Sequence, residues 1–154
     1  MVDFKSNRHQ AVIGVGDTKI REKITKQLPL DSDYKSIIHP TAVISKWVRI
    51  GEGAIITAGC ILTCQIEIGN YTQLNLGTTI GHDCKIGNFF TAAPSVNISG
   101  TCNIGDHVYF GTGAATKQGV NITNNVSIGM GAMVVKDLQE SGTYVGIPAK
   151  IIQK

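Results

Sequence analysis

Large apolar residues recur at every sixth position over most of this chain, with small or polar residues between them. The frame begins at Ile38 and continues to Val134 without an insertion. A period of six matches neither an α-helix, which repeats every 3.6 residues, nor an alternating strand, which repeats every two. The first position of the repeat is occupied by Ile38, Ile44, Ile50, Ile56, Leu62, Ile68, Leu74, Ile80, Ile86, Ala92, Ile98, Ile104, Phe110, Thr116, Ile122, Ile128 and Val134.

Two other positions of the repeat favour small residues. The fifth position is mostly small or β-branched, and Cys60, Cys84 and Cys102 fall there, as expected of side chains that fill a core. We interpret the glycines at the second position as corner residues that tolerate unusual backbone angles. These glycines are Gly51, Gly69, Gly81, Gly87, Gly105, Gly111 and Gly129.

The repeat therefore describes a flat face followed by a corner, and three such units close a triangular coil. Residue n then lies against residue n+18 in the next coil, and like side chains stack in interior columns. Ala92 and Phe110 are neighbours in one such column, where the larger ring can take the space that the smaller residue leaves. The pattern predicts an all-β fold, a left-handed parallel β-helix over residues 37–138.

The residues before the repeat, 1–36, predict one short βα segment. We expect a buried strand from Ala11 to Val15, a Gly14–Gly16 turn, an N-cap at Asp17 and a helix that runs to about Gln27. Pro29 follows and would end the helix.

The expected helix has an apolar face made of Ile20, Ile24 and Leu28, which should pack inward. Its polar face includes Glu22 and Lys26 at the supportive i,i+4 spacing, together with Lys19 and Lys23. One βα unit can hardly bury its own apolar face, so we expect it to pack on the β-helix.

Composition and charge argue for a small-molecule partner. A net charge of +3 without a Lys/Arg block gives no reason to expect nucleic acid, and no apolar run approaches the ~20 residues of a membrane span. The first residues, MVDFKSNRHQ, lack the apolar segment of a secretion signal. We therefore expect a cytoplasmic protein whose cysteines remain thiols.

One of the four histidines lies where chemistry could occur. His82 stands beside Asp83 at a corner in the middle of the repeat, so both side chains should project outward from an edge. Histidine can act as a base near neutral pH, and a carboxylate partner fixes its tautomer. We expect structural or merely exposed positions for His9, His39 and His107. Cys64, one coil before His82, leaves a Cys-His nucleophile as an alternative.

The repeat resembles that of the hexapeptide acyltransferases, [LIV]-G-x-x-[STAV]-x, over about two-thirds of the chain. AVIGVGDTKIREKI is similar to the last part of the α/β domain in bacterial sugar acetyltransferases of the sialic acid O-acetyltransferase and nucleotide-sugar N-acetyltransferase type. The first strand and glycine-rich loop of that domain are missing, which puts a nucleotide ligand in doubt. VGIPAK, within an expected C-terminal cap at 139–154, resembles the closing motif of the same family.

The segment NLGTTIGHD matches the family's catalytic pattern N-x-G-x-x-I-x-H-[DE]. The resemblance implies acetyl transfer from acetyl-CoA to an amino or hydroxyl group of a sugar or nucleotide-sugar. It implies that His82 is the base, that Asp83 orients it and that Asn75 contacts the substrate. Many relatives carry a second histidine nine residues after the first, where this chain has Thr91, so we expect Thr91 to contact the acceptor differently.

The resemblance also implies a homotrimer whose coenzyme lies between two subunits. Gly100, one coil beyond His82, would donate its backbone N–H to the thioester carbonyl. The pantetheine arm would lie along coil corners of glycines and neighbouring residues, and the closing motif would add a lysine. The remaining coenzyme-binding residues are Gly111, Thr112, Gly129, Met130 and Lys150.

Two other functions fit the predicted fold. A γ-type carbonic anhydrase needs three histidine ligands spaced by 36 and 5 residues, but counting from His82 gives Gln118 and Thr123, so no metal is expected. A non-catalytic trimeric scaffold or binding module remains the second alternative. Binding of acetyl-CoA would separate the two hypotheses, because a ligand of the native state must stabilise it.

Overall fold

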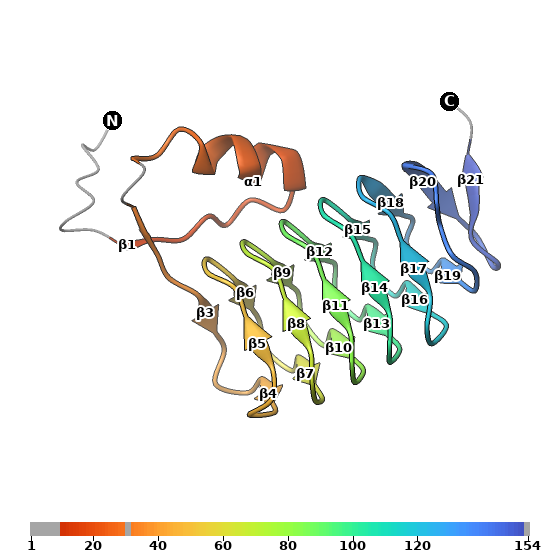
Figure 1. Cartoon of the computed structure of the whole chain (residues 1–154), viewed down its shortest axis with the longest axis horizontal. Coiled ribbons are helices and arrows are strands. Elements are labelled where there is room, and N and C mark those ends of the chain that lie inside the picture. Colours follow the sequence, from red (N-terminus) through yellow and green to blue (C-terminus); the bar gives the residue numbers. More distant parts are fainter. Residues whose placement is uncertain (1–9, 30–31, 153–154) are drawn as a thin grey trace.

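The computed structural model describes residues 10–29 and 32–152, and most of them form a left-handed parallel β-helix (Figure 1). Short strands alternate with corners, and successive coils stack along one axis. His9 lies outside the described residues. Each coil contributes one strand to each of three parallel sheets, which are the three faces of a triangular prism. The fold class predicted from the repeat is confirmed.

We number the faces in the order in which the chain meets them. Face 1 contains β3 (Ile37–Ile38), β6 (Ile55–Ile56), β9 (Gln73–Leu74), β12 (Thr91–Ala92), β15 (Tyr109–Phe110), β18 (Val126–Ile128), β20 (Gly142–Val145) and β21 (Lys150–Ile152). Face 2 contains β4 (Val43–Ile44), β7 (Ile61–Leu62), β10 (Thr79–Ile80), β13 (Asn97–Ile98), β16 (Ala115–Thr116) and β19 (Met133–Val134). Face 3 contains β5 (Arg49–Ile50), β8 (Glu67–Ile68), β11 (Lys85–Ile86), β14 (Asn103–Ile104) and β17 (Asn121–Ile122).

The register between coils is the one that the repeat predicts. Ile80 pairs with Ile98 on face 2, and Ala92 pairs with Phe110 on face 1. Ala92 and Phe110 are fully buried, and the Phe110 ring lies 5.8 Å from the ring of Phe90. The predicted neighbours in this column are therefore confirmed. First-position and fifth-position side chains together fill the interior of the prism.

Our explanation of the second-position glycines was wrong. Their φ angles are not in the left-handed region; instead, each lies against the next coil. A Cβ atom on Gly69 would lie 2.6 Å from the carbonyl carbon of Gly87, and one on Gly81 would lie 2.5 Å from the Gly100 nitrogen. Left-handed backbone occurs at the fourth position, at Gly53, Gly59, Gln65, Tyr71, Gly77, Asp83, Phe89, Ser95, Thr101, His107, Gly113, Gly119, Asn125 and Gly131. Close stacking of coils, rather than corner geometry, requires glycine at the second position.

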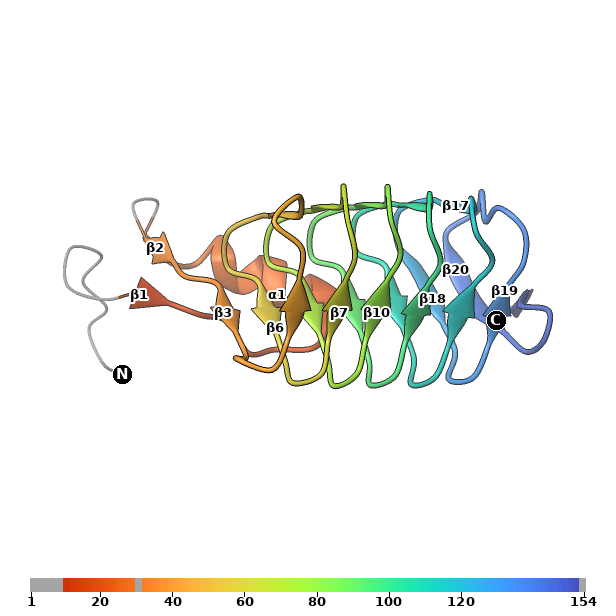
Figure 2. The same cartoon turned by 90° about the horizontal axis from the view of Figure 1, so that it is seen from below.

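The N-terminal segment lies along the side of the coil stack (Figures 1 and 2). The strand expected from Ala11 to Val15 is shorter and begins earlier: β1 covers Gln10–Ala11 and pairs in parallel with β2 (Asp33–Tyr34). Beyond β1 the backbone is held by a side chain instead of a strand, because the Gln73 amide donates a hydrogen bond of 2.8 Å to the Ile13 carbonyl.

The predicted helix begins as expected but ends slightly early. α1 spans Thr18–Thr25, and the Asp17 carboxylate caps it by accepting hydrogen bonds from two backbone amides at 2.9 Å. The last turn tightens beyond Thr25, so the helix does not reach Gln27. The Glu22–Lys26 ion pair is present at 2.7 Å.

The buried face of α1 is not the one that we predicted. Thr18 and Arg21 are the buried residues, whereas Ile24 and Leu28 are only half-buried and Ile20 is 51% exposed. The reason is that α1 docks on an edge that presents carbonyl oxygens, which need donors rather than apolar side chains.

Arg21 supplies these donors. Its guanidinium donates to the Val15 carbonyl at 2.6 Å, to the Phe89 and Phe90 carbonyls at 2.8 and 3.1 Å, and to the Thr91 hydroxyl at 2.9 Å. Burial lowers the pKa of Arg21 to about 10, so the side chain stays protonated at neutral pH. A buried cation thus fastens the N-terminal segment to the β-helix.

The C-terminal residues extend face 1 beyond the last regular coil. β20 pairs in parallel with β18, and β21 folds back antiparallel on β20. The segment predicted as a C-terminal cap thus contains two strands, and its buried Tyr144 covers the end of the interior. Among the helices in residues 10–29 and 32–152, none has the length and apolar character needed to cross a bilayer.

Candidate active site

His82 and Asp83 form a hydrogen-bonded pair on the edge between faces 2 and 3. This edge follows β10, and Asp83 adopts left-handed backbone with φ 58°. The turn brings the carboxylate back to the imidazole, with 2.7 Å between His82 Nδ1 and Asp83 Oδ2. Both side chains are about half exposed. A proton on Nδ1 donates to Asp83, so the lone pair of Nε2 is free to accept another proton.

Gly100 lies directly against the free side of the His82 ring. A Cβ atom at Gly100 would stand 2.7 Å from His82 Nε2, so a side chain there would displace the imidazole. The Gly100 amide has no hydrogen-bond acceptor within the described part of the chain. On the edge between faces 3 and 1, by contrast, the equivalent amides of Asn88 and Asp106 donate to side chains of the next coil. The His82 edge therefore offers a free N–H donor beside a base.

Cys64 lies on the same edge as His82, but within the described residues its thiol makes no hydrogen bond to the imidazole. Its carbonyl accepts the Asp83 amide at 3.0 Å, which supports the turn. Cys60, Cys84 and Cys102 are buried, as expected of core fillers. The neighbouring Cys102 thiol and burial both raise the pKa of Cys84, which disfavours a thiolate there. The alternative of a Cys-His nucleophile gains no support from this arrangement.

Asn75 lies on a different edge, between faces 1 and 2. Its side-chain amide donates to the Ala92 carbonyl at 2.7 Å and bridges two coils. The structure does not place Asn75 beside His82 of the same chain, because all of face 2 separates their edges. A substrate contact by Asn75 stays a prediction.

Thr91 is on face 1 and is only 2% exposed. Its hydroxyl accepts from Arg21 at 2.9 Å and donates to the Gly16 carbonyl at 3.0 Å. The side chain attaches the N-terminal segment, and with that segment in place no ligand can reach it. Substrate binding by Thr91 is an untested prediction that this buried position does not favour.

The predicted coenzyme-binding residues other than Gly100 lie along the edge between faces 1 and 2. Gly111 and Gly129 stack there in successive coils, Thr112 is exposed, and Met130 is 77% exposed. Lys150 is exposed in β21, opposite Val145, which in turn covers Gly129. These residues do gather in one region, but not in the region of His82.

The predicted site is thus divided between two edges that flank face 2. His82, Asp83 and Gly100 occupy one edge, and Gly111 with its neighbours occupies the other. One prism cannot bring its own two edges together. A complete site of the predicted kind requires the second edge from another chain.

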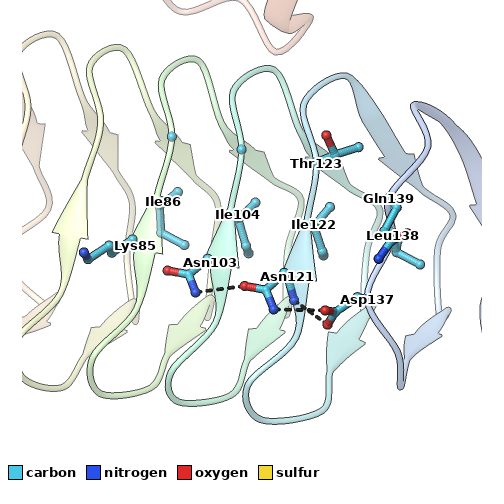
Figure 3. Close-up of a pocket in the computed structure, with 12 residues that line it drawn as sticks. Lys85, Ile86, Asn103, Ile104, Asn121, Ile122, Thr123, Asp137, Leu138 and Gln139 are labelled. Atoms are coloured by element: carbon cyan, nitrogen blue, oxygen red, sulfur yellow. Dashed lines mark hydrogen bonds between the residues drawn. The ribbon is translucent and has the colours of Figure 1, made fainter.

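A groove of about 550 Å³ runs along face 3 and extends to the beginning of the edge between faces 3 and 1 (Figure 3). Its polar wall is a ladder in which Asn103 donates to Asn121 at 2.9 Å and Asn121 donates to Asp137 at 3.0 Å. Asp137 accepts hydrogen bonds from the backbone amide and from the side chain of Asn121, and these two bonds lower its pKa. The sequence did not predict this groove, although Asn103 and Asn121 stand at the outward sixth position and Asp137 just after the repeat. Because the ladder satisfies itself, its groups are poor candidates for chemistry.

The other described histidines have structural surroundings. His107 stacks on Phe89 with ring centroids 5.0 Å apart, and its Nε2 lies 3.4 Å from a Glu22 oxygen. His39 contacts the Thr41 hydroxyl at 2.9 Å. Within the described ranges, no three His, Cys, Asp or Glu side chains are grouped so that they could hold a metal ion.

Comparisons with known proteins point to one enzyme family. Residues 103–136 match the model described as the hexapeptide repeat of succinyl-transferase. A segment of 48 residues is 40% identical to UDP-N-acetylbacillosamine N-acetyltransferase from Bacillus subtilis (strain 168). That match covers 30% of this chain and 22% of the relative, so it spans about a fifth of the relative's length.

Two solved structures match nearly the whole chain. PerB from Caulobacter crescentus, in complex with CoA and GDP-perosamine, is 32% identical with a TM-score of 0.89, over 92% of this chain and 69% of that chain. The acetyltransferase domain of PglB from Neisseria gonorrhoeae FA1090, in complex with acetyl coenzyme A, is 28% identical with a TM-score of 0.91. That match covers 97% of this chain and 73% of that chain.

Proposed function

Because this chain belongs to the hexapeptide-repeat acyltransferases of the bacterial sugar N-acetyltransferase type, we propose that it transfers an acetyl group from acetyl-CoA to a sugar amine. The observation that carries the proposal is the His82–Asp83 pair beside the free amide of Gly100. The relatives favour an amine over a hydroxyl acceptor, since the names of PerB's ligand and of the Bacillus enzyme describe amino sugars or their N-acetylation.

In the proposed reaction His82 is the general base. Nε2 accepts a proton from the acceptor amine while the amine nitrogen attacks the thioester carbonyl carbon. The new C–N bond forms, the C–S bond breaks, and the protonated imidazole returns its proton to the departing CoA sulfur. Asp83 accepts a hydrogen bond from Nδ1 throughout, which stabilises the imidazolium and holds the ring in place.

Gly100 is proposed to stabilise the oxyanion. The tetrahedral intermediate places negative charge on the former carbonyl oxygen, and a preorganised N–H donor lowers the energy of that state. The Gly100 amide has no acceptor within the described part of the chain, and Gly100 lies against His82 Nε2. The absent Cβ keeps a side chain at this position from displacing the imidazole.

Face 2 is the proposed interface of a homotrimer. Its outward side chains are uncharged, and Val43 and Ile61 are 62% and 44% exposed. Face 3 carries the charged Arg49 and Glu67 in the corresponding column, and face 1 is covered in part by the N-terminal segment. Exposed apolar surface of this kind marks an interaction site, and closed symmetry is usual for soluble homo-oligomers.

Three prisms that meet through face 2 would also complete the site. Each His82 edge would lie beside the Gly111 edge of the next chain, so the pantetheine arm could lie between them. Asn75, on the same edge as Gly111, would act from the second chain, and Thr91 is left out of the proposal.

A cytoplasmic location is part of the proposal, because all four cysteines are free thiols.

Acetyl-CoA binding and transfer test this function directly. Acetyl-CoA at 100 times its Kd should stabilise the native protein by about 2.7 kcal/mol, measurable as a raised melting temperature. CoA thiol should then be released only when an amino sugar is present, with mass spectrometry showing one added acetyl group. Stabilisation without transfer to any amino sugar or nucleotide-linked amino sugar would favour a binding module. No stabilisation at all would favour the scaffold.

A further inference from the structure

Thr116 places a hydroxyl in an interior column of the β-helix that is otherwise apolar. It stands at the first position of the repeat, where every other residue except Ala92 is large and apolar. The residue is 6% exposed, so its hydroxyl must find hydrogen-bond partners within the fold. A buried hydroxyl costs stability unless it is bonded. The partners of Thr116 therefore indicate why the column is interrupted here.

The Thr116 hydroxyl replaces one step of the backbone hydrogen bonding between two coils. In the preceding coil the second-position amide follows the regular pattern, and Gly81 donates to the Ile98 carbonyl at 2.8 Å. The Ser99 amide donates instead to Thr116 Oγ1 at 2.9 Å, and the Ser99 hydroxyl donates to the Thr116 carbonyl at 2.6 Å. Strands β13 and β16 accordingly pair at one position, whereas β10 and β13 pair at two.

The altered step adjoins the peptide bond that carries the Gly100 N–H. The carbonyl of this peptide belongs to Ser99, and it accepts a hydrogen bond of 3.1 Å from the buried thiol of Cys84. The neighbouring Cys102 thiol and burial raise the pKa of Cys84, so the thiol keeps the proton that it donates. Ser99 is thus held on both sides of its α-carbon, at its amide and at its carbonyl. Rotation of the Ser99–Gly100 peptide plane is therefore restricted.

The orientation of this peptide matters for the chemistry proposed at His82. A hydrogen bond weakens steeply as its angle departs from linearity, so an oxyanion donor must be fixed in direction before the reaction. A hydrogen bond to the carbonyl of a peptide also polarises its N–H. On the other side of Gly100, the Thr101 amide donates to the His82 carbonyl at 2.7 Å. Donor and base are thereby held in a fixed relation.

We propose that Thr116, Ser99 and Cys84 are positioning residues that fix the direction of the Gly100 N–H toward the thioester carbonyl. This inference rests on the proposed function, because it takes Gly100 as the oxyanion donor. The three side chains act through the Ser99–Gly100 peptide and not by contact with the substrate. Without the Thr116 hydroxyl, the Ser99 amide would return to the regular bond with the carbonyl of residue 116 and turn the peptide.

Thr116→Val tests this role, because it removes the hydroxyl and leaves the shape of the side chain almost unchanged. The variant restores the apolar pattern of the repeat, so it should melt at the wild-type temperature or above it. Its kcat should nevertheless fall about tenfold, less than the 10²–10³-fold loss that follows complete removal of an oxyanion donor. The KM for acetyl-CoA should not change, because the lost interaction belongs to the transition state. Thr116→Ser should restore most of the kcat.

Thr72→Val is the matched control. Thr72 is a fully buried threonine whose hydroxyl donates to the Gly69 carbonyl at 3.1 Å, on the edge between faces 3 and 1. The same chemical change at this distant place should leave kcat unaltered. Cys84→Ala is a second, independent variant and should also lower kcat with an unchanged KM. Cys84→Ser should recover activity, because a hydroxyl can donate to the Ser99 carbonyl as the thiol does.

Nuclear magnetic resonance provides a readout that does not depend on turnover. Labelling of serine carbonyl carbons with ¹³C and of glycine nitrogens with ¹⁵N selects glycines that follow a serine, and these are Gly100 and Gly142. The Gly100 amide signal should move in Thr116→Val and in Cys84→Ala but not in Thr72→Val. The Gly142 signal should stay in place in all three variants and serves as the internal reference.

Three results would overturn the inference. One is a wild-type kcat in Thr116→Val, and another is a Gly100 signal that does not move in this variant. The third is a fall in melting temperature large enough to explain the lost activity, which would make Thr116 a structural residue only. If the wild-type protein itself transfers no acetyl group, the proposed function fails. The Gly100 signal then still decides whether Thr116 and Cys84 orient this peptide.

Discussion

Replacing His82 by Ala is expected to lower acetyl transfer by about two to four orders of magnitude, the usual contribution of a general base. The imidazole is half exposed at an edge, so its loss should leave the prism and its affinity for acetyl-CoA nearly unchanged. Steady-state kinetics should show the loss in kcat, while the ligand-induced rise in melting temperature persists.

The matched control is His39→Ala. His39 is also exposed and bonds only locally to Thr41, so its removal should leave turnover unchanged. The turnover of Asp83→Asn should lie between those of His82→Ala and His39→Ala. The asparagine amide can still contact the ring, but it cannot stabilise the imidazolium. Turnover like that of the wild type in His82→Ala would remove this residue as the base.

Replacing Ile98 by Asp should prevent folding altogether rather than inactivate the protein selectively. Ile98 is buried in the middle of an interior column, between Ile80 and the coil that carries Ala115. A carboxylate there has neither water nor a cation, and the cost of several kcal/mol is a large part of the stability of a domain. Circular dichroism and sedimentation should show an unfolded or aggregated chain.

Asn103→Asp provides the comparison for that experiment. This residue points outward on face 3, where a carboxylate remains hydrated, so the variant should melt within a few degrees of the wild type. If Ile98→Asp were a soluble oligomer with an unchanged melting point, the inward register described here would be wrong.

The coil could be predicted from the sequence because its cause is local and repeated. From Ile56 to Val134 every first-position side chain is buried in the interior, so the same apolar signal recurs in each repeat. The reason for glycine at Gly69 or Gly81 could not be predicted, because it depends on how closely the next coil approaches. The distance between neighbouring coils is a property of the stacked structure and cannot be predicted from the sequence of one repeat.

The N-terminal helix shows the limit of reading one element in isolation. Its periodicity favoured Ile20 as a buried residue, but the surface on which α1 docks offers the carbonyls of Phe89 and Phe90. Arg21 satisfies them and is therefore buried in its place. An amphipathic pattern identifies which residues are apolar, but it does not identify the chemistry of the partner surface.

The candidate site was predictable to a similar degree. The His82–Asp83 pair follows from adjacent residues at a corner, and the structure places them in hydrogen-bond contact. Spacing along the chain did not show that Asn75 and Gly111 lie on another edge, because edges appear only after the coil closes.

The central claim is that one active site takes His82 from one chain and the Gly111 edge from another. Mixed oligomers test it most directly. One parent carries His82→Ala and the other a bulky block at the second edge. Thr112→Trp is a better block than a change at Gly111, where a Cβ would lie 2.6 Å from the Met130 nitrogen and disturb the coil itself.

The measurement is acetyl transfer after the two inactive parents have exchanged subunits, with exchange verified by mass spectrometry of the intact oligomers. Random mixing in equal amounts gives about one groove in four with both edges unmodified, so about a quarter of wild-type activity should return. Well-exchanged hybrids that recover no activity, or an active monomer in sedimentation, would show instead that His82 works within a single chain.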